Sequence, residues 1–120
     1  MKLAVVGVRD YKFNITSFLD SWIKTHGIPN EIISGDNKGL ETNVKKYAIK
    51  QCIPLNIFSI VLKNQNLFNE KLQYLFKHAT HVLLFSDTDY IPKNISYIIK
   101  KYKKLKIWLC NFDKIIYLNT

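Results

Sequence analysis

Short apolar runs alternate with amphipathic segments along the whole chain. Runs of four to eight residues rich in Val, Ile and Leu, bounded by glycine, proline or polar residues, are typical of buried strands. We predict strands at 2–7, 31–35, 54–60, 81–86 and 106–110, and a short edge strand at 114–118. Between them, apolar residues recur three and four positions apart, which predicts helices at 14–27, 40–50, 68–79 and 94–104.

This alternation of buried strands and helices indicates a parallel sheet covered by helices on both faces. The runs at 2–7 and 81–86 are the most continuously apolar, so we expect them at the centre, which gives the strand order 3-2-1-4-5. We therefore predict one doubly wound, Rossmann-like α/β domain over residues 1–120, with about five parallel strands and four helices. Ligands of such sheets bind beyond the carboxyl ends of the strands, where the strand order reverses. This rule selects the loops 7–13, 35–39 and 86–93.

Aromatic residues lie on several of the predicted helices. We expect the stripe of Phe13, Phe18 and Trp22 in the core rather than as a platform for stacking bases. The third and fourth helices carry more aromatic residues than one core is expected to cover. These residues are Tyr74, Phe76, Tyr97 and Tyr102. We therefore expect a homodimer that covers these two helices.

The chain has a formal net charge of +9 and only one arginine, Arg9, among its 18 basic residues. A protein that reads nucleic acid usually favours arginine, because the guanidinium group bonds bases and phosphates bidentately. Asn, Ile, Tyr, Phe and Lys share A/T-rich codons, so coding bias accounts for part of the charge and is compatible with a viral or mobile-element origin. The lysines Lys93, Lys100, Lys101, Lys103, Lys104 and Lys106 have no acidic residue among them. Two interpretations of these lysines stay open: a solvated helix face, or a surface for an anionic partner such as nucleic acid.

Nothing in the sequence points to export or to a membrane. No apolar run reaches the roughly 20 residues of a membrane-spanning helix, and the first ten residues lack the pattern of a secretory signal. Cys52 and Cys110 are far apart and have no neighbouring cysteine or suitably spaced histidine, so we expect both thiols reduced in the core. We expect a cytoplasmic protein with no membrane contact, no metal site and no cofactor.

Two of the three selected loops carry motifs. "KLAVVGVRDY" contains the predicted first strand and the loop after it. "IISGDNKGLE" runs from the second strand through its loop into the second helix. Together they resemble the YspA-like family of the SLOG superfamily, a Rossmann-like group that also holds the Lonely Guy phosphoribohydrolases and the DNA-processing protein DprA. That family has G-S-R-D at the first loop and S-G-G-A-x-G-A-D at the second. The matching positions are Gly7, Arg9 and Asp10 in the first motif and Ser34, Gly35 and Gly39 in the second, with Val8 for serine and Glu41 for aspartate.

The departures from the family pattern lie at the phosphate-binding turn. Asp36 replaces the second glycine and Asn37 the alanine. A glycine lets a phosphate approach the backbone N–H groups of such a turn, whereas a carboxylate repels it. Asp36 is alternatively a cap for the second helix. The third loop, "SDTDYIPKN", contains no glycine, and its Asp87 and Asp89 are read either as turn residues or as a pair for Mg²⁺ with a diphosphate.

The resemblance implies binding of a nucleotide or nucleotide-derived ligand, as a sensor or a sequestering protein. The expected ligand-binding residues are Gly7, Val8, Arg9, Asp10, Ser34, Gly35, Asp36, Asn37, Lys38, Gly39, Glu41, Ser86 and Asp87. The phosphoribohydrolase motif P-G-G-x-G-T is absent, which speaks against that activity. An enzyme that cleaves a nucleotide-derived ligand stays open as an alternative, with Glu41 and Asp10 as the placed carboxylates. A nucleic-acid-associated protein is the other alternative. The histidines His26, His78 and His81 have no recognisable partner in the sequence.

Overall fold

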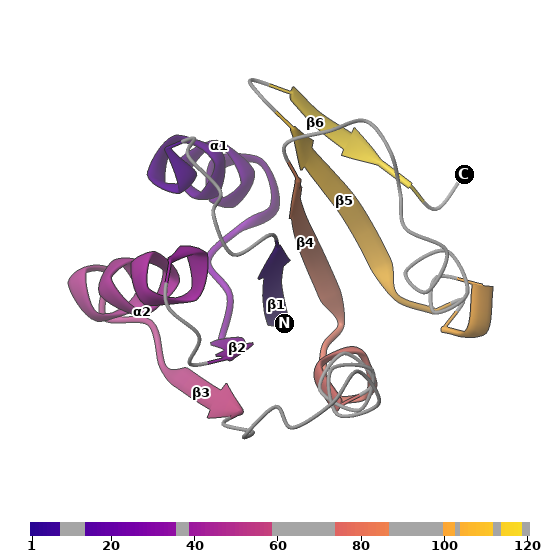
Figure 1. Cartoon of the computed structure of the whole chain (residues 1–120), viewed down its shortest axis with the longest axis horizontal. Coiled ribbons are helices and arrows are strands. Elements are labelled where there is room, and N and C mark those ends of the chain that lie inside the picture. The colour runs from indigo at the N-terminus through magenta and orange to yellow at the C-terminus, as the bar shows by residue number, and fades with distance from the viewer. Residues whose placement is uncertain are drawn as a thin grey trace.

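The computed structural model describes residues 1–7, 14–35, 39–58, 74–86, 100–102, 104–111 and 114–118. These residues form an α/β structure around a six-stranded sheet with the order β3-β2-β1-β4-β5-β6 (Figure 1). The strands are β1 (Lys2–Gly7), β2 (Glu31–Gly35), β3 (Leu55–Phe58), β4 (His81–Ser86), β5 (Lys106–Asn111) and β6 (Lys114–Tyr117). The helices are α1 (Ile15–His26) and α2 (Leu40–Lys50). Residues 74–78 and 100–101 are also helical.

The strand order predicted from the sequence is confirmed. Each neighbouring pair among the first five strands is parallel, and β6 is antiparallel to β5. The sheet therefore has six strands rather than five, because the expected edge strand at 114–118 joins it. β1 and β4 lie at the centre, and their residues Leu3–Val6 and Val82–Phe85 are buried. Helices on both faces explain why these strands are apolar on both sides.

Helix α1 begins and ends where its capping residues predict. The Asn14 side chain accepts a hydrogen bond from the Thr16 N–H at 2.9 Å, which caps the first turn. Gly27 follows the last turn with φ of 98°, and its N–H donates to the Ile23 carbonyl oxygen at 2.7 Å. A residue with a Cβ atom rarely adopts this backbone conformation, so glycine stops the helix here.

The predicted third and fourth helices are described in part. Residues 74–78 are helical, inside the range 68–79, and the earlier part of that range lies outside the described residues. The fourth helix was predicted to continue to residue 104, which is wrong, because Tyr102 is no longer helical and Lys104 lies in a turn. The Leu105 N–H donates to the Tyr102 carbonyl oxygen at 3.1 Å, which turns the chain into β5.

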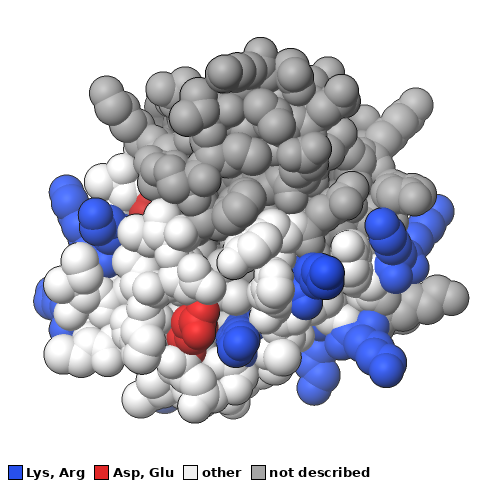
Figure 2. All heavy atoms as spheres, turned by 90° about the horizontal axis from the view of Figure 1, so that it is seen from below, with Lys and Arg blue, Asp and Glu red and all other residues white. Residues whose placement is uncertain are grey.

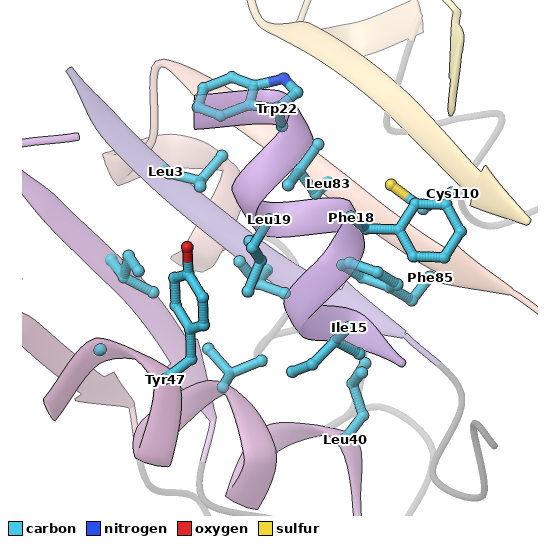
Figure 3. Packing of buried hydrophobic residues seen from close by; sticks show 14 of the residues in the cluster. Leu3, Ile15, Phe18, Leu19, Trp22, Leu40, Tyr47, Leu83, Phe85 and Cys110 are labelled. Atoms are coloured by element: carbon cyan, nitrogen blue, oxygen red, sulfur yellow. The ribbon is translucent and has the colours of Figure 1, made fainter. Parts of the chain in front are cut away.

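Two hydrophobic clusters lie on the two faces of the sheet. The first fills the space between the sheet and the helices α1 and α2, which cover the same face (Figure 1). Figure 3 shows its centre, where Phe18 of α1 meets Phe85 of β4 edge to face, with 5.5 Å between ring centroids. The second lies on the opposite face and contains Leu75, Phe76 and Ala79 from the segment around 74–79. Both clusters contain residues of β1 and β4, so the sheet divides the core into two layers.

A polar contact ties the two helices of the first layer together. The Tyr47 hydroxyl of α2 donates to the Asp20 carboxylate of α1 at 2.6 Å. Burial, followed by this hydrogen bond, raises the pKa of Tyr47 above its usual value, so the hydroxyl keeps its proton. The contact joins α1 to α2.

The predictions for the aromatic residues are confirmed in part. Phe18 and Trp22 are buried as predicted, and Phe13 lies outside the described residues. Phe76 was expected at a dimer surface but is buried within one chain, because its side chain packs under β4 and β5 in the second cluster. Tyr74 and Tyr102 are partly buried against the same cluster, and Tyr97 lies outside the described residues, so the homodimer stays a prediction.

The two thiols differ in their surroundings. Cys110 is buried in the first cluster, and burial raises the pKa of its thiol to about 12. Cys52 is exposed, which corrects the expectation that both lie in the core. It follows the end of α2 in a left-handed conformation, with φ of 56°, where the chain turns away from the helix and the side chain faces solvent. Both cysteines are free, as predicted.

Candidate functional site

The reversal of strand order places a candidate site at the carboxyl ends of β1 and β4. β1 pairs with β2 on one side and with β4 on the other. After β1 the chain passes through α1 to β2, the neighbour of β1 on one side. β4, its neighbour on the other side, comes after β3, which lies at the edge of the sheet beyond β2. Such a point leaves a crevice between two connections that diverge, and ligands of doubly wound sheets bind there.

The structure describes part of the predicted site. Gly7 ends β1, Ser34 and Gly35 end β2, and Gly39 and Glu41 lie at the start of α2. Ser86 ends β4, and its backbone pairs with Asn111 of β5. The predicted residues that lie outside the described part of the chain are Val8, Arg9, Asp10, Asp36, Asn37, Lys38 and Asp87. All the described members lie on one edge of the sheet, as the sequence predicts.

Gly7 is required by packing at this edge. A Cβ atom at this position would lie 2.5 Å from the Phe85 carbonyl oxygen and 2.8 Å from the Phe85 Cβ atom, and it would also overlap the Leu40 side chain. These separations are far shorter than van der Waals contacts between heavy atoms. The glycine at the end of β1 therefore lets β4 and α2 approach, whether or not a ligand binds next to it.

Gly39 is required by backbone conformation. It is the residue before α2 and has φ of 90° and ψ of −120°, a combination that favours glycine. As a glycine it offers no side chain to cap the helix, so the first turn of α2 presents backbone N–H groups without a cap from this residue. The positive end of the helix dipole points the same way, which favours an anionic or polar group at this position.

The buried polar side chains gather at the same edge. Among the described residues, Ser34, Glu41 and Asn111 are the buried polar or charged ones, with 1 %, 7 % and 1 % of their surface exposed. The Ser34 hydroxyl donates to the Val5 carbonyl oxygen at 3.2 Å and so joins β2 to β1. Asn111 ends β5, on the other side of β1 and β4. The sequence did not single out Asn111, although its place at the end of a buried strand is the signal that could have identified it.

A cluster of two tryptophans and two histidines lies toward the amino ends of β4 and β5, away from the candidate site. His26, the last residue of α1, stacks on Trp22 with 4.7 Å between ring centroids. His81, the first residue of β4, lies parallel to Trp108 of β5 at 5.8 Å and 6°. The two pairs touch, since the Trp22 and Trp108 rings are 5.4 Å apart. We call these four residues the Trp–His cluster.

The Trp–His cluster was missed in the sequence because its members come from three distant segments. His26 and His81 were interpreted there as histidines without partners, and both in fact contact tryptophan rings. Burial is the largest cause that lowers the pKa of His81, followed by the positive charges of Lys106, His26 and the chain's amino group. The Nδ1 atom of His81 also lies 2.7 Å from the Thr80 hydroxyl.

The lowered pKa of His81 predicts a loss of stability in mild acid. The unfolded chain takes up a proton at this imidazole near its ordinary pKa of 6.5, whereas the folded protein does so only at lower pH. The free energy of unfolding should therefore fall as the pH decreases through 6.5 and level off below the folded pKa. Urea unfolding at about pH 7.5 and about pH 5.5 measures this loss. The variant His81→Gln should show a smaller loss than the unchanged protein, and equal losses in both would contradict the prediction.

Comparison with known proteins finds no similar protein. No protein-family model, no curated protein and no solved structure matches this chain. In the part of the chain that the structure describes, no three His, Cys, Asp or Glu side chains group to hold a metal ion. No helix within these described ranges has the length and apolar character to cross a membrane.

Proposed function

We propose that this protein binds a nucleotide or a nucleotide-derived ligand at the carboxyl edge of its sheet, between β1 and β4. The observation that carries the proposal is the gathering of Ser34, Glu41 and Asn111, the buried polar side chains of the described residues, at this one edge. They lie on β2, α2 and β5, and ligand sites carry a few polar groups among apolar ones, so buried polar side chains along this edge support a binding site there. The strand order supports the same place independently.

The nucleotide class comes from the motifs at this edge. The resemblance to the YspA-like family of the SLOG superfamily rests on residues that include Gly7 and Gly35, at the ends of β1 and β2, and Gly39, before α2. The positive end of the α2 dipole, next to Gly39, favours a polar or anionic group. Asp36 disfavours a phosphate directly on the turn, so we propose that phosphate faces Arg9 and Lys38. The ligand's hydroxyl groups or base edge then face Asp36 and Asn37, since carboxylates accept hydrogen bonds from ribose hydroxyls.

We propose a binding function rather than catalysis. Glu41 is the one carboxylate of the described residues at this edge, and only 7 % of its surface is exposed. It lies in the first turn of α2, where a negative charge is stabilised by the helix dipole. This position gives Glu41 a structural role that needs no reaction. A sensor or a protein that sequesters a nucleotide signal needs only the binding step.

A thermal-shift screen over nucleotides, dinucleotides and ADP-ribose derivatives identifies the ligand, because a ligand that binds the folded state raises the melting temperature. With that ligand, Arg9→Ala should weaken binding about ten- to a hundredfold, because it removes a charge-assisted hydrogen bond worth roughly 1.5–3 kcal/mol. Isothermal titration calorimetry measures the change.

Lys24→Ala is the matched control for Arg9→Ala, because Lys24 is exposed near the end of α1, at the opposite edge of the sheet. It removes one positive charge without touching the crevice and should leave the affinity within about twofold. Asp36→Gly should shift the preference toward ligands with more phosphate groups. The proposal fails if no compound raises the melting temperature, or if Arg9→Ala and Lys24→Ala have the same small effect.

A further inference from the structure

A groove of about 490 Å³ lies at the opposite, amino edge of the sheet. Two segments form it: the chain around 76–80, which enters β4, and the chain around 101–105, which enters β5. They are held together by the parallel pairing of His81 with Lys106 and by the Lys106 N–H, which donates to the Thr80 carbonyl oxygen at 3.3 Å. We call this the amino-edge groove.

The amino-edge groove has an apolar floor and a basic rim. Phe76, Ala79 and Leu105 form the floor and are all buried. The exposed side chains of Lys77, Lys101 and Lys104 line the rim. The two remaining lining residues, Thr80 and Tyr102, offer a hydroxyl group and a partly exposed aromatic ring. The lining residues within the described part of the chain include no acidic residue.

The positive charge extends beyond the rim of the groove. Lys2 and Lys106 begin β1 and β5 at the same edge. Burial, followed by the positive charges of Lys106, His26 and the chain's amino group, lowers the pKa of His81, which begins β4 there. Figure 2 shows one face of the molecule, on which lysine side chains appear at many places and acidic side chains at few. An anion that approaches the groove is therefore attracted by several charges at once.

We propose that the amino-edge groove binds single-stranded nucleic acid without sequence preference, with phosphates on its three lysines and a base over Tyr102. The volume of about 490 Å³ lies within the range of small-ligand pockets, about 300–1,000 Å³. The Lys101 ammonium lies over the Tyr102 ring, 5.6 Å from its centre, so a positive charge and an aromatic ring adjoin at the rim, and a base that stacks there displaces the exposed lysine side chain from the ring. Proteins that bind single strands combine these two features. The charged lining residues that the structure describes are lysines, which act as point charges, so we do not expect the groove to distinguish bases at their edges.

Other polyanions fit the groove less well. A duplex presents a rigid rod whose bases are paired, so it cannot place a base on an apolar floor. A membrane surface requires apolar side chains that project outward beside the basic ones. The large exposed hydrophobic residues of the described chain are Ile28, Ile49, Ile57, Ile116 and Tyr117. None of them lines the groove.

This proposal concerns a different edge of the sheet from the nucleotide site, so the two can fail separately. The test measures the fluorescence anisotropy of a labelled oligothymidylate of about twelve nucleotides, in salt from about 50 to about 200 mM. We expect the affinity to fall with salt, because binding releases counterions. Three contacted phosphates contribute about −2 to the slope of log affinity against log salt, at about −0.7 for each phosphate of a single strand.

The decisive variant is the triple change Lys77→Gln, Lys101→Gln and Lys104→Gln. It should weaken binding at least tenfold and reduce the slope by about 2, and circular dichroism checks that it is folded. The matched control is Lys24→Gln, Lys45→Gln and Lys46→Gln, which removes the same charge from exposed positions on α1 and α2. The control should keep most of the affinity and of the slope. A further variant, Tyr102→Leu, should weaken binding about fivefold or more without changing the slope, because stacking is lost and no charge.

Three results would overturn the proposal. Equal losses in both triple variants would show a diffuse effect of net charge with no dedicated groove. Binding of a duplex of the same length as tightly as the single strand would remove the role of the unpaired base. No binding of the oligonucleotide, together with retention on phosphatidylserine vesicles that the triple variant loses, would assign the groove to membrane lipids. In each case the nucleotide screen at the carboxyl edge is unaffected.

Discussion

Replacing Trp22 with alanine is expected to lower the free energy of unfolding by about 3–5 kcal/mol, the usual cost of removing a large buried ring. Only 1 % of the Trp22 surface is exposed. Its ring contacts His26, His81 and Trp108, with centroid distances of 4.7, 5.8 and 5.4 Å. Alanine would leave a cavity between α1 and the sheet that the surrounding rings cannot fill. Urea unfolding followed by circular dichroism measures the loss.

Trp22→Phe is the informative companion to Trp22→Ala. The indole Nε1 atom of Trp22 is buried and has no hydrogen-bond partner in the part of the protein that the structure describes. An unsatisfied buried donor costs about 1–3 kcal/mol. Phenylalanine removes this donor and keeps most of the ring, so it should be far less destabilising than alanine. If both variants lose the same free energy, the indole N–H is satisfied in solution and the explanation is wrong.

Gly7→Ala is expected to destabilise the protein by about 1–3 kcal/mol, although it adds one methyl group at an exposed position. The added Cβ atom would meet the Phe85 carbonyl oxygen, which belongs to the central strand β4 and cannot move without breaking the sheet. The backbone of Gly7 is not in the left-handed region, so steric overlap and not φ is the cause. The midpoint of urea unfolding checks the expected loss.

The double variant Gly7→Ala with Leu40→Ala separates the two contacts. Trimming Leu40 removes one overlap and leaves the backbone of Phe85 in place. The cost of Gly7→Ala should therefore persist in the Leu40→Ala background, and its disappearance would assign the overlap to the leucine alone. The result also guides the ligand experiments, because a loss of binding in Gly7→Ala would reflect packing as well as contact with a ligand.

Most of the sheet, and the helices α1 and α2, were predictable from the local pattern of apolar residues. β1 and β4 are apolar on both faces because both faces are covered, and a run of this kind is recognisable without knowing its neighbours. The bounds of α1 follow from Asn14 and Gly27, whose capping chemistry is local. The strand order followed from apolarity, since the most apolar strands take the centre.

What the sequence could not show depends on contacts between distant segments. The Trp–His cluster joins the end of α1 to the starts of β4 and β5, and no spacing along the chain encodes that meeting. The amino-edge groove was hidden for the same reason. Its Lys101 and Lys104 belong to a lysine run that was visible in the sequence, whereas Lys77 comes from the preceding helical segment. Segments that enter neighbouring parallel strands meet at the amino edge of the sheet, and this rule predicts that Lys77 lies near Lys101 and Lys104.

The exposed Cys52 illustrates a limit of residue type as a guide to burial. Free cysteine is usually buried, so the core was the reasonable expectation. The end of α2 requires a left-handed residue at this point, and the side chain in that turn faces solvent. Backbone geometry at the helix end therefore decided the position against the preference of the side chain.

The place of β1 in the sheet has a consequence for synthesis on the ribosome. β1 comes from residues 2–7, yet it pairs on one side with β4 at residues 81–86. Translation adds about 5–20 residues per second, so this central strand has an open edge for several seconds before its second partner exists. β2 and β3 can join it early, which leaves the backbone N–H and C=O groups on the other side of β1 unpaired. The nascent chain is thus most vulnerable to aggregation between the completion of β3 and the emergence of β4, a period in which chaperones have the greatest effect.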